Sequence, residues 1–231
     1  MRPSTKCLIW DFDGTLGYRV GGWPGALAQI LKQYMNHEVD TEVFRPFMRH
    51  GFPWQSPTRE NPPGRSAEAW WDAVLPVFAE ALCGGCQLPP DAATSLAKRM
   101  RAVYTDVREW RLYDDTLEVL TGLQQDGWKH AILSNHVPEL PELIAGLGLG
   151  SLIGLIINSA ATGFEKPHPR AFHTALTALE SPSEVWMIGD NIEADVLGAE
   201  SVGLRAILVR NDSPRSARCA EGLRDVRRFL G

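Results

Sequence analysis

The chain has 231 residues, of which 44% are hydrophobic and 22% charged, a balance typical of a folded globular protein and not of a disordered or fibrous one. This length allows one large core, alone or with a smaller inserted module, but not two full-sized unrelated domains. The net charge of −5 provides no broad positive field, which argues against general nucleic-acid binding. No apolar run is long enough to span a bilayer and the first residues lack a signal-peptide pattern, so we expect no membrane partner and a cytoplasmic location.

The first predicted element is a short buried strand at residues 7–10, which leads into a polar turn. Asp11 and Asp13 lie two residues apart in this turn, so on an extended chain both carboxylates point to the same side. Gly14 then allows a sharp bend that exposes them. Two carboxylates this close repel each other unless a cation or a shared proton relieves them. The pair therefore predicts a Mg²⁺ site.

Between residues 23 and 107 the apolar residues recur at helical spacing, and no convincing strand pattern interrupts them. Residues 45–66 hold many of the prolines and several arginines, which predicts a long irregular loop. The basic side chains of this loop could recognise a second anionic group of a ligand, with Trp54 packing on a ring, although solvated loop charges are commoner. These basic residues are Arg45, Arg49, His50, Arg59 and Arg65.

After Trp110 the pattern alternates between strands and helices. Strands fit near residues 129–134, 152–158, 185–189 and 205–209. Helices fit near residues 115–126, 138–147, 168–179, 192–202 and 217–229. Alternation of this kind favours an α/β fold with a parallel sheet covered by helices on both faces. We therefore predict an α/β core domain made of residues 1–16 and 108–231, with a helical domain inserted at residues 17–107.

Polar residues cluster at the carboxyl ends of four predicted strands. Because these ends share one crevice in an open parallel sheet, residues far apart in the sequence converge there. The residues concerned are Asp11, Asp13, Ser134, Asn135, Lys166, Asp190 and Asp195. We interpret them as the parts of one site.

The chemistry of these side chains suits phosphoryl transfer. With a cation neutralising the pair, Asp11 is a suitable nucleophile toward phosphorus, while Asp13 can protonate the leaving oxygen and later take a proton from water. Lys166 adds the positive charge that the equatorial phosphoryl oxygens need. Ser134 and Asn135, together with free N–H groups at the start of the following helix, offer a cradle for those oxygens.

The same residues offer Mg²⁺ the ligands that it prefers, a few carboxylate oxygens together with water and substrate phosphate. Asp190, after the fourth strand, adds a carboxylate to those of Asp11 and Asp13. Asp195, five residues later and one turn into the next helix, could complete or orient the ligand shell, or merely cap that helix. We predict Mg²⁺ as the cofactor and a small phosphorylated metabolite as the partner.

Four sequence segments together resemble the motifs of the haloacid dehalogenase superfamily in their order and spacing. They are Asp11-Phe12-Asp13-Gly14-Thr15-Leu16, Ser134-Asn135, Lys166-Pro167 and Gly189-Asp190-Asn191 through Asp195. The resemblance implies a Rossmann-like core, Asp11 as the nucleophile of a phosphatase, Asp13 as its acid/base, and Mg²⁺ held by Asp11, the Asp13 carbonyl and Asp190. The helical insertion resembles the mobile cap of this family, which closes over substrate and excludes water.

Two alternative functions stay open at this stage. A phosphosugar mutase of the same superfamily uses the same two aspartates but keeps the aspartyl-phosphate away from water, and motifs do not separate it from a phosphatase. A non-catalytic binding protein could also keep this fold, although the intact catalytic set argues against it. A dehalogenase has no leaving oxygen to protonate, so Asp13 argues against that activity. A monomer and a homodimer fit the sequence equally well.

Three further residues carry no assigned chemistry. His136 lies next to the predicted site, yet a packing or hydrogen-bonding role is the commoner one for such a histidine. Cys83 and Cys86 flank two glycines, but a zinc site needs four ligands and the sequence holds no second pair. We interpret this segment as a glycine-rich helix end.

Overall fold

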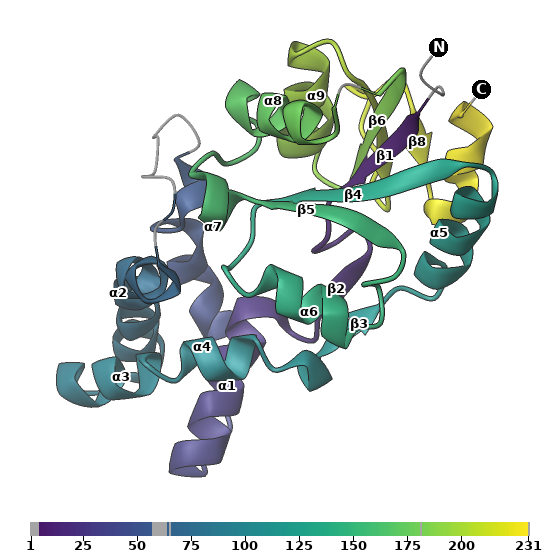
Figure 1. The fold of residues 1–231 in the computed structure, drawn as a ribbon. Coiled ribbons are helices and arrows are strands. Elements are labelled where there is room, and N and C mark those ends of the chain that lie inside the picture. The colour runs from purple at the N-terminus through teal and green to yellow at the C-terminus, as the bar shows by residue number, and fades with distance from the viewer. Residues whose placement is uncertain (1–4, 57–63, 65, 181, 231) are drawn as a thin grey trace.

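The computed structural model describes residues 5–56, 64, 66–180 and 182–230, and its centre is a six-stranded sheet (Figure 1). In spatial order the strands are β5 (Ile153–Asn158), β4 (Trp128–Ser134), β1 (Lys6–Trp10), β6 (Glu184–Gly189), β7 (Arg205–Val209) and β8 (Cys219–Ala220). All neighbouring strands run parallel. The predicted Rossmann-like α/β class is therefore confirmed.

The two faces of the sheet have separate helical covers, because alternate strand residues point to opposite faces. In β1, Cys7 and Ile9 belong to one buried cluster, and Leu8 and Trp10 belong to the other. The helices on the first face are α8 (Pro169–Ala178), the π-helical turn η4 (Ile192–Leu197) and α9 (Gly198–Ser201). Those on the second face are α5 (Thr116–Gln125), α6 (Leu140–Gly146) and the 3-10 helix η5 (Leu223–Phe229). Burial on both faces explains why these strands consist of continuous apolar runs.

A helical region lies on the side of the sheet where β4 and β5 end, at the lower left of Figure 1. Its helices are α1 (Gly22–Met35), η1 (Thr41–Arg49), η2 (Pro53–Gln55), α2 (Ala67–Cys86), α3 (Pro90–Ala97), α4 (Met100–Tyr104) and η3 (Val107–Glu109). An antiparallel ribbon of β2 (Gly17–Arg19) and β3 (Trp110–Leu112) joins this region to the sheet. In the described part of the chain, no helix combines the length and apolarity needed to cross a bilayer. The division into two domains stays a prediction.

The predicted helix at residues 217–229 is only partly correct, because its first part is not helical. This segment contains β8, in which Cys219 pairs with Leu208 of β7, and then the separate 3-10 helix η5. Gly222 is extended between the two elements. Backbone hydrogen bonds to β7 extend the sheet by one strand, and this tertiary pairing outweighs the helical spacing of the apolar side chains.

The predicted irregular loop at residues 45–66 is partly helical. The 3-10 helix η1 continues to Arg49, and η2 adds a second short turn. Phe44 is fully buried and anchors η1 in the core, which explains the order of this proline-containing segment. Proline has a fixed φ that suits short helical turns, so its presence does not by itself exclude them.

The glycines between Cys83 and Cys86 are explained by packing. Both cysteines lie in the last turn of α2, and both are free thiols. A Cβ at Gly84 would lie only 2.3 Å from the ring of Phe47. Glycine at this position therefore lets η1 pack closely against the end of α2.

Candidate active site

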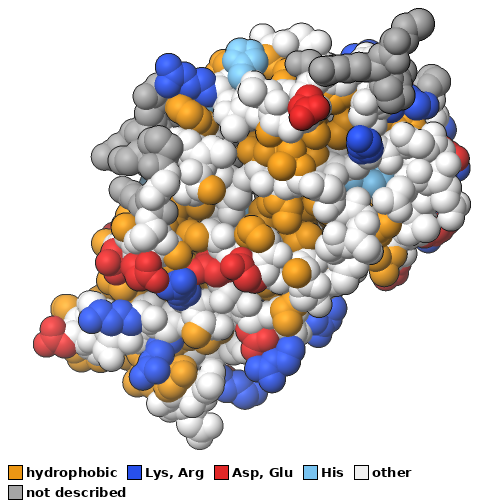
Figure 2. All heavy atoms as spheres, in the orientation of Figure 1, with side chains coloured by type: hydrophobic (Ala, Val, Ile, Leu, Met, Phe, Trp, Pro, Cys, Tyr) orange, Lys and Arg blue, Asp and Glu red, His pale blue; other side chains and the backbone are white. Residues whose placement is uncertain are grey.

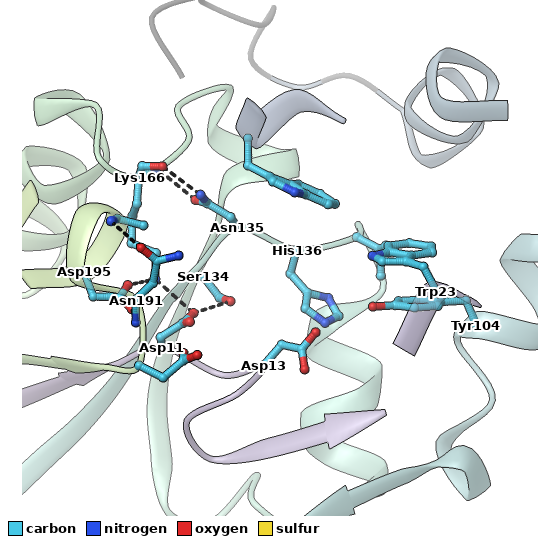
Figure 3. Close-up of a pocket in the computed structure, with 14 residues that line it drawn as sticks. Asp11, Asp13, Trp23, Tyr104, Ser134, Asn135, His136, Lys166, Asn191 and Asp195 are labelled. Atoms are coloured by element: carbon cyan, nitrogen blue, oxygen red, sulfur yellow. Dashed lines mark hydrogen bonds and ion pairs between the residues drawn. The ribbon is translucent and has the colours of Figure 1, made fainter. Parts of the chain in front are cut away.

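One cavity of about 240 Å³ at the carboxyl ends of the strands is lined by all seven side chains of the predicted site (Figure 3). Asp11 follows β1, Ser134 ends β4 and Asp190 follows β6, and these three strands are neighbours in the sheet. Lys166 comes from the loop between α7 (Ser159–Thr162) and α8. The parallel topology therefore brings together residues that are up to 184 positions apart, from Asp11 to Asp195.

A tight turn after β1 presents Asp11 and Asp13 to the cavity. Gly14 in this turn has a φ of +90°, a conformation that side-chain-bearing residues rarely adopt. A Cβ at Gly14 would also lie 2.6 Å from a carboxylate oxygen of Asp190. The hydroxyl of Thr15 donates to Oδ1 of Asp190 at 3.1 Å. Gly14 and Thr15 thus place Asp190 directly against the turn.

The carboxylate of Asp11 is held by two groups on one of its oxygens. Oδ1 accepts a hydrogen bond from Ser134 Oγ at 2.7 Å and lies 2.9 Å from Lys166 Nζ (Figure 3). The side chain is 13% exposed, and it lines the cavity. These two contacts fix the orientation of the carboxylate without using its second oxygen.

Lys166 is a buried cation between two carboxylates. Its Nζ lies 2.6 Å from Oδ1 of Asp195, and the two side chains are 1% and 0% exposed. Desolvation lowers the pKa of Lys166, but the charges of Asp11 and Asp195 outweigh it and raise the pKa above its usual value. Oδ2 of Asp195 accepts the Asn191 N–H at 3.0 Å. Asp195 therefore positions Lys166 with one oxygen and the loop after β6 with the other.

The side chain of Asn135 joins two loops of the site. Its Nδ2 donates to the Lys166 carbonyl at 2.8 Å, and its Oδ1 accepts the Lys166 N–H at 2.7 Å. This reciprocal pair fixes the backbone from which the Lys166 side chain extends. The role of Asn135 in phosphate binding stays a prediction, whereas its contact with the Lys166 backbone is part of the structure.

The carboxylates form a group that suits a hard cation. Oxygen atoms of Asp11, Asp190 and Asp195 lie within 4.8 Å of one another. Burial and then the charge of Asp11 raise the pKa of Asp190 to about 6. Asp13 is exposed to the cavity, yet desolvation by the surrounding protein, followed by the charges of Asp11 and Asp190, raises its pKa to about 7. A divalent cation with oxygen ligands would relieve this repulsion, so the residues present fit Mg²⁺.

Aromatic side chains of the helical region form the opposite wall of the cavity. They are Trp23 of α1, Trp54 of η2 and Tyr104 of α4. The rings of Trp23 and Tyr104 are stacked, with centroids 3.5 Å apart and planes at 5° (Figure 3). Stacked rings form a rigid apolar surface. The cavity thus has one charged side and one aromatic side.

His136 lies between these two sides. It is 3% exposed, and its ring packs against Phe12 and Trp110, with centroids 5.6 and 5.3 Å away. Burial lowers the pKa of His136 to about 4, so the imidazole is uncharged at neutral pH. Neither ring nitrogen has a hydrogen-bond partner among the described residues. His136 is therefore a cavity-lining residue with unused polar atoms, which its sequence position beside Ser134 and Asn135 indicated only weakly.

The basic residues of the loop after α1 do not line the cavity where the structure describes them. Arg45 pairs with Glu42 on the surface, and Arg49 and His50 are exposed. Figure 2 shows Lys and Arg side chains over the outside of the helical region, interspersed with Asp and Glu. Arg59 and Arg65 lie outside the described residues. Trp54 is the member of the predicted second-anion site that does line the cavity.

Comparisons with known proteins show the family of this chain. A family model described as haloacid dehalogenase-like hydrolase matches residues 5–203. Haloacid dehalogenase-like hydrolase domain-containing protein 3 of Bos taurus is 30% identical, over 92% of this chain and 85% of that protein. Ribulose-1,5-bisphosphate 5-phosphatase of Halopiger xanaduensis is 36% identical, over 87% of this chain and 83% of that protein.

A solved structure also shares the whole fold. The crystal structure of a predicted phosphoglycolate phosphatase from Haemophilus somnus superposes with a TM-score of 0.71. The two sequences are 16% identical, and the match covers 100% of both chains. At this identity the likeness concerns the fold.

Proposed function

The chain belongs to the haloacid dehalogenase-like hydrolases and is a hydrolase of the phosphatase type, and we propose that it cleaves small phosphate monoesters in a Mg²⁺-dependent reaction with Asp11 as the nucleophile. The observation that carries this proposal is the setting of the Asp11 carboxylate. Ser134 and Lys166 orient it through one oxygen, and it faces a cavity that Asp13 also lines. An oriented carboxylate beside a second carboxyl group is the arrangement that covalent phosphoryl transfer needs.

Mg²⁺ would be held by Asp11, Asp190 and the backbone carbonyl of Asp13, with Asp195 as a further candidate. The donor set consists of carboxylate oxygens within 4.8 Å of one another for Asp11, Asp190 and Asp195. When bound, Mg²⁺ would offset the negative charge of the carboxylates and of the phosphoryl group. Because both oxygens of Asp195 already have partners, we infer that the main role of Asp195 is to position Lys166.

The reaction would proceed in two steps on the side chains of this chain. In the first step Asp11 attacks phosphorus, the bond to the leaving oxygen breaks, and Asp13 gives that oxygen a proton. In the second step Asp13 takes a proton from water as the water attacks the aspartyl-phosphate and releases phosphate. In the metal-free protein the pKa of Asp13 is raised to about 7, which favours the protonated carboxyl group that the first step needs. Lys166 stabilises the phosphoryl oxygens during both steps.

The helical region would act as the cap of this active site. We infer that residues 17–107 form a cap domain, because Trp23, Trp54 and Tyr104 from this region line the same cavity as the carboxylates. A closed apolar wall excludes bulk water and strengthens the electrostatic contacts beneath it. The partner would be a small phosphorylated metabolite, as a cavity of this size suggests. A cytoplasmic location and a monomeric or homodimeric state stay predictions from the sequence.

Release of inorganic phosphate tests the proposed function. The wild-type protein is incubated with sugar, nucleotide and small-acid phosphate esters, with Mg²⁺ or with a chelator. We expect release that requires Mg²⁺, and a loss of at least about a thousandfold in Asp11→Asn, because the amide is no nucleophile toward phosphorus. Asp114→Asn, at an exposed aspartate outside the cavity, is the matched control and keeps wild-type activity.

Two other results would contradict the phosphatase proposal. Transfer of the phosphoryl group to another hydroxyl of the substrate, without phosphate release, would identify a mutase. Absence of any reaction by folded protein, with no heat of Mg²⁺ binding, would identify a non-catalytic binding protein.

A further inference from the structure

The aromatic wall of the cavity bears on which leaving groups the enzyme accepts. We propose that it selects phosphate monoesters whose leaving group is uncharged and presents an apolar or ring face, and that it discriminates against leaving groups that carry a second carboxylate or phosphate. This inference rests on the proposed phosphatase function. It concerns the part of the substrate beyond the phosphoryl group.

The leaving group must lie on the side of the cavity where Asp13 lies, because Asp13 gives the leaving oxygen its proton. In Figure 3 Asp13 lies next to His136 and Tyr104, on the side of the cavity away from Lys166. The ring centroids of Tyr104 and His136 are 6.4 Å apart. Tyr104 is stacked in turn on Trp23. These aromatic side chains therefore surround the position of the leaving group.

The wall presents apolar ring surface and, among the described residues, no charged group. Trp23, Trp54 and Tyr104 present rings, on which the apolar face of a ligand can pack. His136 is enclosed by Phe12 and Trp110, an environment that favours the uncharged imidazole. Its two nitrogens are enclosed and have no partner among the described residues, so this side chain adds no charge to the wall. An uncharged ring matches these properties.

The charge balance of the cavity opposes a second anionic group. Among the described residues, four carboxylates line the cavity and Lys166 is the one cation. Lys166 already contacts Asp11 and Asp195 at 2.9 and 2.6 Å. The positive charge of a bound Mg²⁺ would be balanced by the negative charge of the substrate's phosphoryl group. A further anion would therefore meet like charge, with no other cation among the described lining residues to pair with.

One pair of substrates isolates this effect. The phosphate esters of 4-hydroxybenzamide and 4-hydroxybenzoate have the same ring and nearly the same size, and they differ by one negative charge. With Mg²⁺ present, we expect kcat/KM for the amide ester to exceed that for the carboxylate ester by about tenfold or more. An equal or higher kcat/KM for the carboxylate ester would overturn the inference. Absence of Mg²⁺-dependent release from every ester would instead contradict the proposed function.

Variants of Trp54 test where the leaving group lies. Trp54→Arg places a cation in the wall, and Trp54→Leu removes the same ring without adding charge. We expect Trp54→Arg to shift the ratio of the two kcat/KM values by about tenfold toward the carboxylate ester, and Trp54→Leu to leave the ratio near the wild-type value. An unchanged ratio in folded Trp54→Arg would overturn the placement against this wall. The wild-type ratio decides the proposal even where a variant does not fold.

Discussion

Lys166 and Asp195 form an ion pair of 2.6 Å in which both side chains are almost completely buried. Burial of two charges costs several kcal/mol per ion unless close geometry and further hydrogen bonds compensate for the lost water. The compensation here comes from Asp11 on the lysine side and from the Asn191 N–H on the aspartate side. The position of Lys166, the proposed catalytic cation, therefore depends on its contact with Asp195.

Replacement of Asp195 by Asn tests this dependence. We expect the free energy of unfolding to fall by about 3–5 kcal/mol, because a buried lysine loses one of its two carboxylates. The measurement is urea unfolding at pH 7. The control is the double variant Lys166→Met with Asp195→Asn, which leaves no unpaired buried cation and should recover part of the loss. The single variant Lys166→Met completes the comparison. If the loss in the double variant equalled the sum of the losses in Asp195→Asn and Lys166→Met, the two residues would not be coupled.

A second prediction concerns the space around Asp195. A Cβ at Gly189 would lie 2.1 Å from a carboxylate oxygen of Asp195, so Gly189→Ala must displace that side chain. We expect the unfolding free energy to fall by about 1–3 kcal/mol or more, and phosphate release to fall with it. Gly154→Ala, in β5 of the same sheet, is the matched control, because its Cβ would meet its nearest neighbour at 3.7 Å. A loss in Gly189→Ala no larger than that in Gly154→Ala would contradict the predicted displacement of Asp195.

The sheet and the charged side of the cavity were predictable from the sequence, and the reason is topological. In a parallel sheet every strand ends at the same edge, so Asp11, Ser134 and Asp190 were expected at one edge once the strands were recognised. The strand pattern was strong because both faces of the sheet are buried. The predicted helix at residues 217–229 failed in its first part because sheet pairing with β7 is a long-range effect that local spacing does not encode.

The aromatic side of the cavity was not predictable in the same way. Trp23, Trp54 and Tyr104 come from three different helical elements, whose relative placement follows from packing and not from a periodic pattern. Gly189 and Thr15 lie inside the recognised motifs, yet their roles appear only through contacts with Asp195 and Asp190. Sequence patterns give residue types at strand ends, whereas the shape of the wall depends on three-dimensional contacts.

A third prediction concerns Glu165, a buried carboxyl group outside the cavity lining. Burial raises its pKa from 4.5 to about 7, although a hydrogen bond from Ser159 and the charge of Lys166 partly oppose this. The folded state therefore holds its proton more tightly than the unfolded chain does. The stabilisation is fully present below pH 4.5 and is lost as the pH rises through about 7.

The comparison of wild type with Glu165→Gln isolates this group. We expect the difference in unfolding free energy between the two proteins to change by on the order of 3 kcal/mol between pH 4.5 and pH 8, in favour of the variant at high pH. Urea unfolding at several pH values measures it. A difference that does not change with pH would contradict the raised pKa of Glu165.

The fourth prediction uses Mg²⁺ and Asp190. Without metal, the charge of Asp190 is opposed by that of Asp11, which contributes to its raised pKa. Asp190→Asn removes this repulsion, so the metal-free variant should be at least as stable as the metal-free wild type. With Mg²⁺ the order reverses, because the wild type gains the binding energy and the variant has lost a ligand. Thermal unfolding in chelator and in excess Mg²⁺ measures both states.

The expected size of the effect follows from linkage. At a Mg²⁺ concentration about a hundredfold above the dissociation constant, binding to the folded state adds about 2.7 kcal/mol, which for a chain of this length raises Tm by roughly 5–10 °C. Asp114→Asn, at an exposed aspartate outside the cavity, should keep the full increase. If Asp190→Asn also kept it, Mg²⁺ would have to bind without Asp190, and the proposed donor set would be wrong. A reversal of the stability order of wild type and Asp190→Asn on adding Mg²⁺ requires two properties of Asp190. Its charge must be repelled in the metal-free site, and its carboxylate must bind Mg²⁺ in the loaded site.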